Sequence, residues 1–174
     1  CAKCHDPKQY DVPAHHFHEV NTDGAQCVSC HMPGKNYMVN DFRRDHSFRV
    51  PRPDLSVQYG TPNACNQCHT DKSAGWAAEA VVNWYGPDRA AHYSEALAAA
   101  NTGDPSVMPE LIQMVADTSA GEIVRATAVW LLSSSGDQQG QGTIVSSLRN
   151  PDPLIRYTAV NALAPFSQED RLRY

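Results

Sequence analysis

The chain has 174 residues, of which 41% are hydrophobic and 19% charged, and its formal net charge is −5. This length accommodates one large domain or two small ones. The acidic balance and the lack of a long apolar run exclude a nucleic-acid-binding protein and a span of the membrane by this chain.

The two parts of the chain differ in composition. Residues 1–74 contain all six cysteines and seven of the eight histidines, but only ten Val, Leu, Ile or Phe residues. So few aliphatic side chains bury too little surface to offset the entropy of ordering the chain. Residues 75–174 have six Lys or Arg against eleven Asp or Glu and account for the whole net charge. We expect two domains, 1–74 and 75–174, of which the first needs a large apolar cofactor to fold.

Three Cys-x-x-Cys-His motifs use every cysteine of the first domain. The first motif is residues 1–5, the second 27–31 and the third 65–69. This is the attachment motif of c-type haem, in which two thiols bond to the porphyrin and the adjacent histidine ligates the iron. With eight histidines in the chain, His in all three places has a chance probability of about one in ten thousand. The sequence predicts three covalent haems c, attached through Cys1, Cys4, Cys27, Cys30, Cys65 and Cys68, with His5, His31 and His69 on the irons.

Two other interpretations use the same cysteines. Zinc binds Cys and His with tetrahedral geometry, but three motifs offer nine ligands, which does not fit four-coordinate sites. A disulfide framework would pair cysteines three residues apart and would leave the repeated histidine unexplained. We therefore favour haem.

The elements of the first domain should be short. Six prolines interrupt residues 1–74, so we expect short helical turns around each motif, joined by loops. Successive motifs begin 26 and 38 residues apart, which leaves little protein between neighbouring haems. The haems should lie close together and exchange electrons readily.

Each iron also needs a sixth ligand. Five histidines lie outside the motifs, namely His15, His16, His18, His46 and His92. Three of them suffice if every haem is bis-His. We place His46 first, because arginines on both sides of it are expected to pair with haem propionates and Phe48 to pack on a ring. A solvated basic loop is the alternative for this stretch.

The run of residues 15–18 offers more ligands than one haem can use. Adjacent side chains point apart, so the three histidines cannot all face one metal. We rank His18 before His15, and His15 before His16. His92 is expected on a helix beyond the haem domain, where it is either a ligand or a surface residue.

The second domain has the pattern of an α-helical segment. Apolar residues at helical spacing over 76–84 end at Gly86-Pro87, with Asp71 or Ser73 as the cap, and further helices are expected over 88–101 and 109–117. Residues 123–132 then align without gaps to 154–163, at an offset of 31. The repeat predicts a HEAT-like helical domain used for protein contact, with a plain helical cap as the alternative. The expected fold class is mostly α, a loop-rich multihaem segment followed by HEAT-like repeats.

Three stretches resemble a known family. The second motif continues as His-Met-Pro, residues 44–49 read Arg-Asp-His-Ser-Phe-Arg, and residues 60–69 read Gly-Thr-Pro-Asn-Ala-Cys-Asn-Gln-Cys-His. These are similar to bacterial multihaem cytochromes related to cytochrome c554 and to the haem core of ammonia-forming nitrite reductases, which often continue into helical repeats. The resemblance implies covalent haem c, packed haem pairs, and His46 as a distal ligand. The chain lacks the Cys-x-x-Cys-Lys of the nitrite reductases' active haem, which argues against nitrite reduction.

These observations predict an electron carrier rather than an enzyme. Covalent haem attachment takes place outside the cytoplasmic membrane, so we expect a periplasmic or extracellular protein whose precursor has a signal peptide, with further haems upstream as a possibility. The expected partners are redox proteins or identical subunits. The alternatives are a subunit of a stacked-haem conducting filament and a multihaem oxidoreductase acting on a small nitrogen or sulfur compound.

Overall fold

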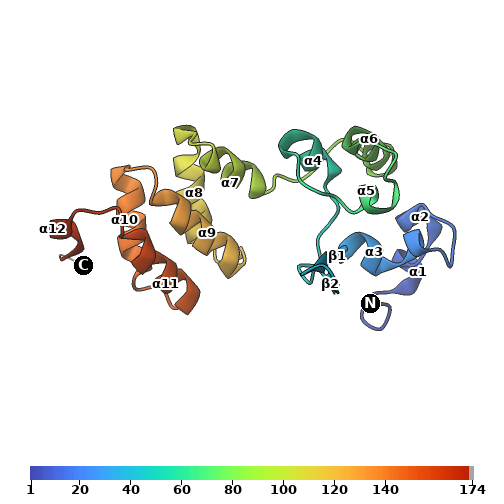
Figure 1. Ribbon diagram of the computed structural model, residues 1–174, viewed down its shortest axis with the longest axis horizontal. Helices are drawn as coiled ribbons and strands as arrows, with labels where there is room; N and C mark the ends of the chain where they lie inside the picture. Colours follow the sequence, from blue (N-terminus) through green and yellow to red (C-terminus); the bar gives the residue numbers. More distant parts are fainter. Residues whose placement is uncertain (173–174) are drawn as a thin grey trace. The chain divides into compact units, whose positions relative to one another are not determined.

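The protein is mostly helical, as predicted. The computed structural model describes residues 1–172, of which 55% are helical, with twelve α-helices and one two-stranded sheet in that range. The chain divides into two compact units, Cys1–Arg89 and the residues from Ala90 onward. Figure 1 shows the elements of each unit in chain order.

The helices of the first unit are short. They are α1 (Pro7–Tyr10), α2 (Pro13–His16), the 3-10 turn η1 (Asp23–Ala25), α3 (Cys27–His31), α4 (Pro53–Tyr59), α5 (Cys65–Cys68) and α6 (Ala74–Tyr85). Proline is the first residue of α1, α2 and α4. An N–H at this position makes no hydrogen bond within the helix, so proline can lack it without cost. Only α4 and α6 exceed five residues. The expected short helical turns at the motifs are therefore present.

A β-hairpin follows the second motif, and the sequence did not predict it. Its strands are β1 (Gly34–Tyr37) and β2 (Asp41–Arg44), paired antiparallel. A Cβ at Gly34 would lie 2.2 Å from the ring of Phe42, so a larger residue there would require this ring to move. The turn residues Met38 and Val39 have φ of 48° and 75°. The turn was missed because this conformation is usually marked by Asn or Gly.

The small core of the first unit lies between α4 and α6. Pro53 and Leu55 of α4 are buried, as are Ala77 and Val81 of α6. The Ser73 hydroxyl caps α6 by accepting the N–H of Trp76. This helix was expected in the second domain, but its packing on α4 places it in the first unit.

The second unit is a stack of helices. They are α7 (Ser94–Asn101), the 3-10 turn η2 (Pro105–Val107), α8 (Met108–Ala116), α9 (Glu122–Leu132), α10 (Gln138–Ser147), α11 (Pro153–Ala162) and α12 (Gln168–Arg171). The largest fully buried aliphatic side chains lie on α8 to α11 and are Leu111, Val129, Leu132, Ile144 and Ile155. Helix α9 packs against both α8 and α11, side by side in Figure 1.

The two sequence repeats form α9 and α11, and several aligned residues have the same environment. Arg125 donates to a carbonyl before its helix, that of Val115, and Arg156 does the same with Asn150 and Pro151. The aligned alanines, Ala128 and Ala159, are both fully buried. The repeat therefore conserves an arginine that ties each helix to the segment before it.

The aligned valines of the two repeats differ in environment. Val129 is fully buried, whereas 61% of Val160 is exposed. Helix α9 lies between two long helices, while α11 is the last long helix in the described chain. The difference follows from position in the stack.

The segment between the units differs from the prediction. A helix was expected over 88–101, but α7 begins only at Ser94. The Arg89 guanidinium donates to the Pro51 carbonyl at 3.2 Å, which holds this end of the first unit in a non-helical conformation. Helix α8 also begins and ends one residue before the expected range of 109–117.

Replacing Ile155 with alanine is expected to destabilise the second unit. The side chain is fully buried in the α9–α11 core, and such a truncation costs about 2–5 kcal/mol. Val160→Ala on the same helix is the control, with an expected change within about 0.5 kcal/mol because the side chain is exposed. Chemical denaturation followed by circular dichroism measures both. Equal effects of the two substitutions would contradict this packing.

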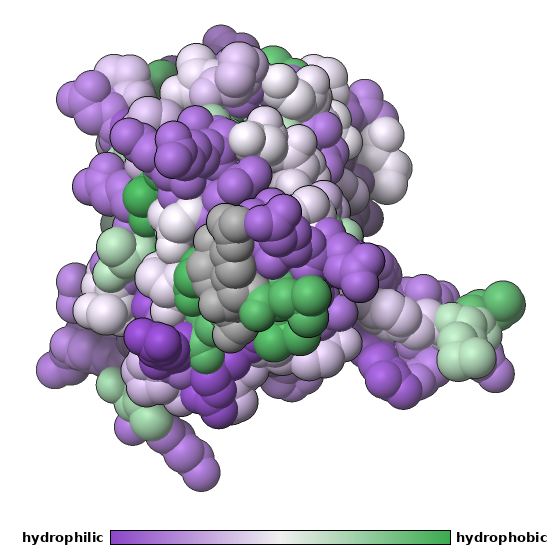
Figure 2. Space-filling view, turned by 90° about the vertical axis from the view of Figure 1, so that its left-hand side faces the viewer, coloured by the Kyte–Doolittle hydropathy of each residue, from purple (hydrophilic) through white to green (hydrophobic). Residues whose placement is uncertain are grey.

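Within residues 1–172, no helix combines the length and hydrophobicity that a bilayer span requires. Figure 2 looks onto the end of the structure that holds α12 and shows a largely hydrophilic face with hydrophobic residues in separate small groups.

Candidate haem-binding site

Each motif forms a tight turn that ends in its histidine. In the first motif the Cys4 and His5 amides both donate to the Cys1 carbonyl. The second and third motifs form α3 and α5. All six cysteines are free thiols in the structure. The turn brings two thiols and an imidazole together from five residues, which is the donor set that covalent haem requires.

The second motif's histidine faces a histidine of α2. The ring centroids of His15 and His31 are 6.2 Å apart, and their planes differ by 13°. His15 was ranked second among the ligands of the 15–18 run. Burial lowers the pKa of His15, and the nearby His31 and His16 lower it further, which favours the neutral imidazole that binds metals.

The third motif's histidine faces the histidine that was ranked first. The ring centroids of His18 and His69 are 6.1 Å apart, with planes 37° from parallel. Gly24 lies directly behind His18, because a Cβ at this glycine would be 2.2 Å from the imidazole. The close approach of η1 thus fixes one side of the His18 ring.

Both separations match the distance required by an iron between two imidazoles. A metal–imidazole nitrogen bond is about 2.0 Å and the nitrogen lies about 1.1 Å from its ring centre, so two axial imidazoles have centroids about 6.2 Å apart. Ordinary aromatic pairs also occur at such distances. Here, however, both His–His ring contacts in the described chain combine a motif histidine with a non-motif histidine. Two motifs therefore each have beside them the second histidine that a bis-His haem c uses.

Ring hydrogen bonds show which nitrogens are available to a metal. The Nδ1 atoms of His18, His31 and His46 contact the carbonyl oxygens of His16, Arg49 and Arg44, at 2.5, 2.8 and 2.8 Å. A carbonyl can only accept, so Nδ1 carries the proton and the Nε2 lone pair is available to a metal. Metal-bound histidines usually have such a second contact.

His16 has the opposite arrangement. Its Nδ1 accepts the N–H of His18 at 3.2 Å, which puts the ring proton on Nε2 and leaves no lone pair there for a metal. The Nδ1 of His92 contacts the Ser94 hydroxyl at 2.7 Å and the Ser94 amide at 3.2 Å. His92 also precedes α7 rather than lying within a helix, and it belongs to the second unit.

The remaining motif histidine, His5, has an aromatic neighbour that is not a histidine. Its ring centroid is 5.8 Å from that of Tyr10, which in turn lies 5.4 Å from His15. No ring contact joins His46 to a motif histidine in the described chain. The structure thus brings His15 and His18 to motif histidines, but does not pair His46 with one.

The arginines around His46 have protein partners. Arg43 forms an ion pair with Asp41 at 2.6 Å, and Arg49 with Asp45 at 3.2 Å. Arg44 donates to two carbonyls at the second motif, those of Val28 and Met32, both at 3.2 Å. These guanidiniums were expected at haem propionates. Arg44 instead ties β2 to α3, and Phe48, expected on a haem ring, is 64% exposed.

The thiols of the second and third motifs lie close together. Burial raises the pKa of Cys30, and the neighbouring thiols of Cys65, Cys68 and Cys27 raise it further. Burial likewise raises the pKa of Cys65. Because His15 and His18 are also only three residues apart, the second and third motifs form one continuous site.

The two tryptophans of α6 have different neighbours. Trp76 lies against the third motif, with its ring centroid 4.8 Å from that of His69. Trp84 instead stacks on Phe17, at 4.5 Å with planes 1° apart. Tyr85 was missed, although its hydroxyl donates to the His15 carbonyl. Helical spacing could have indicated Tyr85. Residues 84 and 85 follow Trp76 by eight and nine positions, which is more than two turns along α6.

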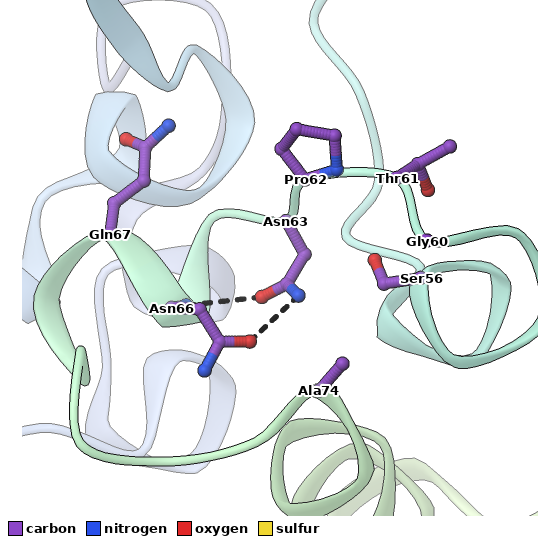
Figure 3. Close-up of a pocket in the computed structure, with 8 residues that line it drawn as sticks. All are labelled: Ser56, Gly60, Thr61, Pro62, Asn63, Asn66, Gln67 and Ala74. Carbon is purple, nitrogen blue, oxygen red and sulfur yellow. Dashed lines mark hydrogen bonds between the residues drawn. The ribbon is translucent and has the colours of Figure 1, made fainter.

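A shallow pocket of about 360 Å³ lies beside the third motif (Figure 3). Its lining includes Ser56, Asn63, Asn66 and Ala74, and Asn63 bonds to both the side chain and the amide of Asn66. The Ser56 hydroxyl is buried without a hydrogen-bond partner. No histidine or cysteine lines the pocket, so it is separate from the His–His pairs.

No three or more His, Cys, Asp or Glu side chains of residues 1–172 gather as a metal site does. A haem iron needs at most two protein ligands, on opposite faces of the ring. Comparisons of the chain with protein-family models, curated proteins and solved structures gave no match.

Proposed function

We propose that this protein is a c-type cytochrome that binds three covalent haems and transfers electrons outside the cytoplasm. The observation that carries the proposal is the pairing of two motif histidines with His15 and His18, at separations that suit a shared iron. The sparse aliphatic core of the first unit supports it, because haems would supply the missing apolar surface. Haem iron supplies a one-electron centre.

In this proposal the chain's residues hold the irons in a six-coordinate, electron-transferring state. The second motif binds a haem with His31 and His15 as axial ligands, and the third with His69 and His18. The carbonyls at Nδ1 of His31 and His18 orient the rings and make the ligands more basic. Two strong ligands on each iron favour electron transfer over reaction with a small molecule.

The first motif is proposed to use His46 as its sixth ligand. His46 has the Nδ1–carbonyl contact that leaves Nε2 available, whereas His16 Nδ1 accepts a backbone N–H and His92 belongs to the second unit. The Tyr10 ring contacts the rings of both His5 and His15. The first haem would therefore lie near the second, and the three would form one electron path.

The second unit contains no haem motif, and we propose that it serves protein contact. Its HEAT-like repeats expose large apolar side chains on α9 and α11, among them Ile123, Trp130 and Tyr157, at 72%, 53% and 69%. A redox protein or a second copy of this chain is the proposed partner.

The mass of the denatured protein tests the cofactor directly. Expressed with a haem-attachment system, the chain should retain three haems, each adding about 616 Da through two thioether bonds. Substituting both cysteines of the third motif with alanine should leave two. A bare polypeptide mass, or a metal lost on acidification, would contradict the proposal.

A further inference from the structure

Helix α6 contacts the His18–His69 pair near its start and the His15–His31 pair at its end. Near its start, the Trp76 ring lies against His69. At its end, the Tyr85 hydroxyl donates to the His15 carbonyl, and the two rings lie edge to face, 6.4 Å apart. Tyr85 follows Trp76 by nine positions, which is about 14 Å along a helix. Because α6 packs on α4 in the core of the unit, it is a firm support for both contacts.

The segment that carries His15 depends on such contacts. Helix α2 has only four residues, too few to be stable alone, and its last carbonyls lack partners within the helix. It ends at Phe17, whose φ of 55° is left-handed. Phe17 stacks on Trp84 and meets Tyr85 edge to face at 5.7 Å. The end of α6 therefore holds α2 and its cap residue by three aromatic contacts and one hydrogen bond.

We propose that Tyr85 is a positioning residue that holds His15 on the iron of the second motif. Its hydroxyl fixes the backbone of the ligand itself, so it opposes the motion by which His15 would leave the metal. A residue that does not contact His15, such as one on an exposed surface, has no such link to the ligand. This inference rests on the proposed haem ligation and adds to it the control of one ligand's dissociation.

The test uses the full haem-loaded chain and Tyr85→Phe, which keeps the ring and removes the hydroxyl. Carbon monoxide binds a six-coordinate ferrous haem only after the distal histidine leaves, so its binding rate reports that opening. Loss of one hydrogen bond should raise the rate at one haem in three about five-fold, with three haems and a low-spin resting spectrum retained. Tyr85→Ala, which also removes the ring contacts, should raise the rate further.

Two controls separate positioning from a general structural effect. Tyr37→Phe, which removes a hydroxyl from the exposed strand β1, should bind carbon monoxide as the unchanged protein does. In a His15→Ala background, Tyr85→Phe should change nothing, because the ligand it holds is absent. A wild-type rate in Tyr85→Phe, or the same increase in the His15→Ala background, would overturn the inference while leaving the haem proposal intact. If the wild-type protein carries no covalent haem, the proposed function itself is overturned.

Discussion

Replacing His15 with alanine is expected to convert the haem of the second motif, and no other, from low-spin to high-spin. The same change at His18 should convert the haem of the third motif. The reason is geometric, since each imidazole faces one motif histidine at about the separation that a shared iron requires. Electron paramagnetic resonance of the ferric protein should show a high-spin signal from one haem in three for each variant.

His16→Ala is the matched control for both substitutions. It removes a histidine from the same segment, but one whose Nδ1 accepts a backbone N–H. Its spectrum should remain fully low-spin. His46→Ala should open the haem of the first motif if our assignment of its sixth ligand is right. A high-spin haem in His16→Ala, together with unchanged His15→Ala or His18→Ala, would show that the pairing is wrong.

Without haem, the two units are expected to differ sharply in order. The second unit buries a continuous aliphatic core across α8, α9, α10 and α11. The first unit buries few side chains, at the contact of α4 and α6, and a domain with so little apolar burial does not offset its chain entropy. Hydrogen exchange on the full chain, produced without haem attachment, should therefore show protected amides after Arg89 and nearly unprotected ones before it.

The haem-loaded chain is the control for this experiment. Covalent haems should restore protection across the first unit, most strongly at α3 and α5, which carry the second and third motifs. Binding of a group by the folded state alone stabilises that state, and the proposed haems would also supply apolar core surface. Equal protection of both units without haem would contradict the proposed role of the cofactor in folding.

Local features of the sequence predicted local structure well. Proline positions indicated short helices in the first unit, and Ser73 caps α6 as one of the two residues expected there. The repeat at an offset of 31 predicted α9 and α11, because helical periodicity and the Asp-Pro entry to the second copy are local signals. The β-hairpin was missed, because its turn residues Met38 and Val39 adopt a left-handed conformation that Asn or Gly usually marks.

The sequence by itself led to the proposed chemistry of attachment, because each motif places two thiols and an imidazole within five residues. It could not determine which histidine meets which motif. His15 and His31 lie 16 residues apart and His18 and His69 lie 51 apart, and no local rule joins residues at such distances. Only the tertiary structure pairs them, through the packing of α2 against the end of α6 and of Trp76 against His69. The domain boundary also depends on tertiary structure. From the sequence, α6 was expected to be a helix of the second domain, but its contact with α4 assigns it to the first unit.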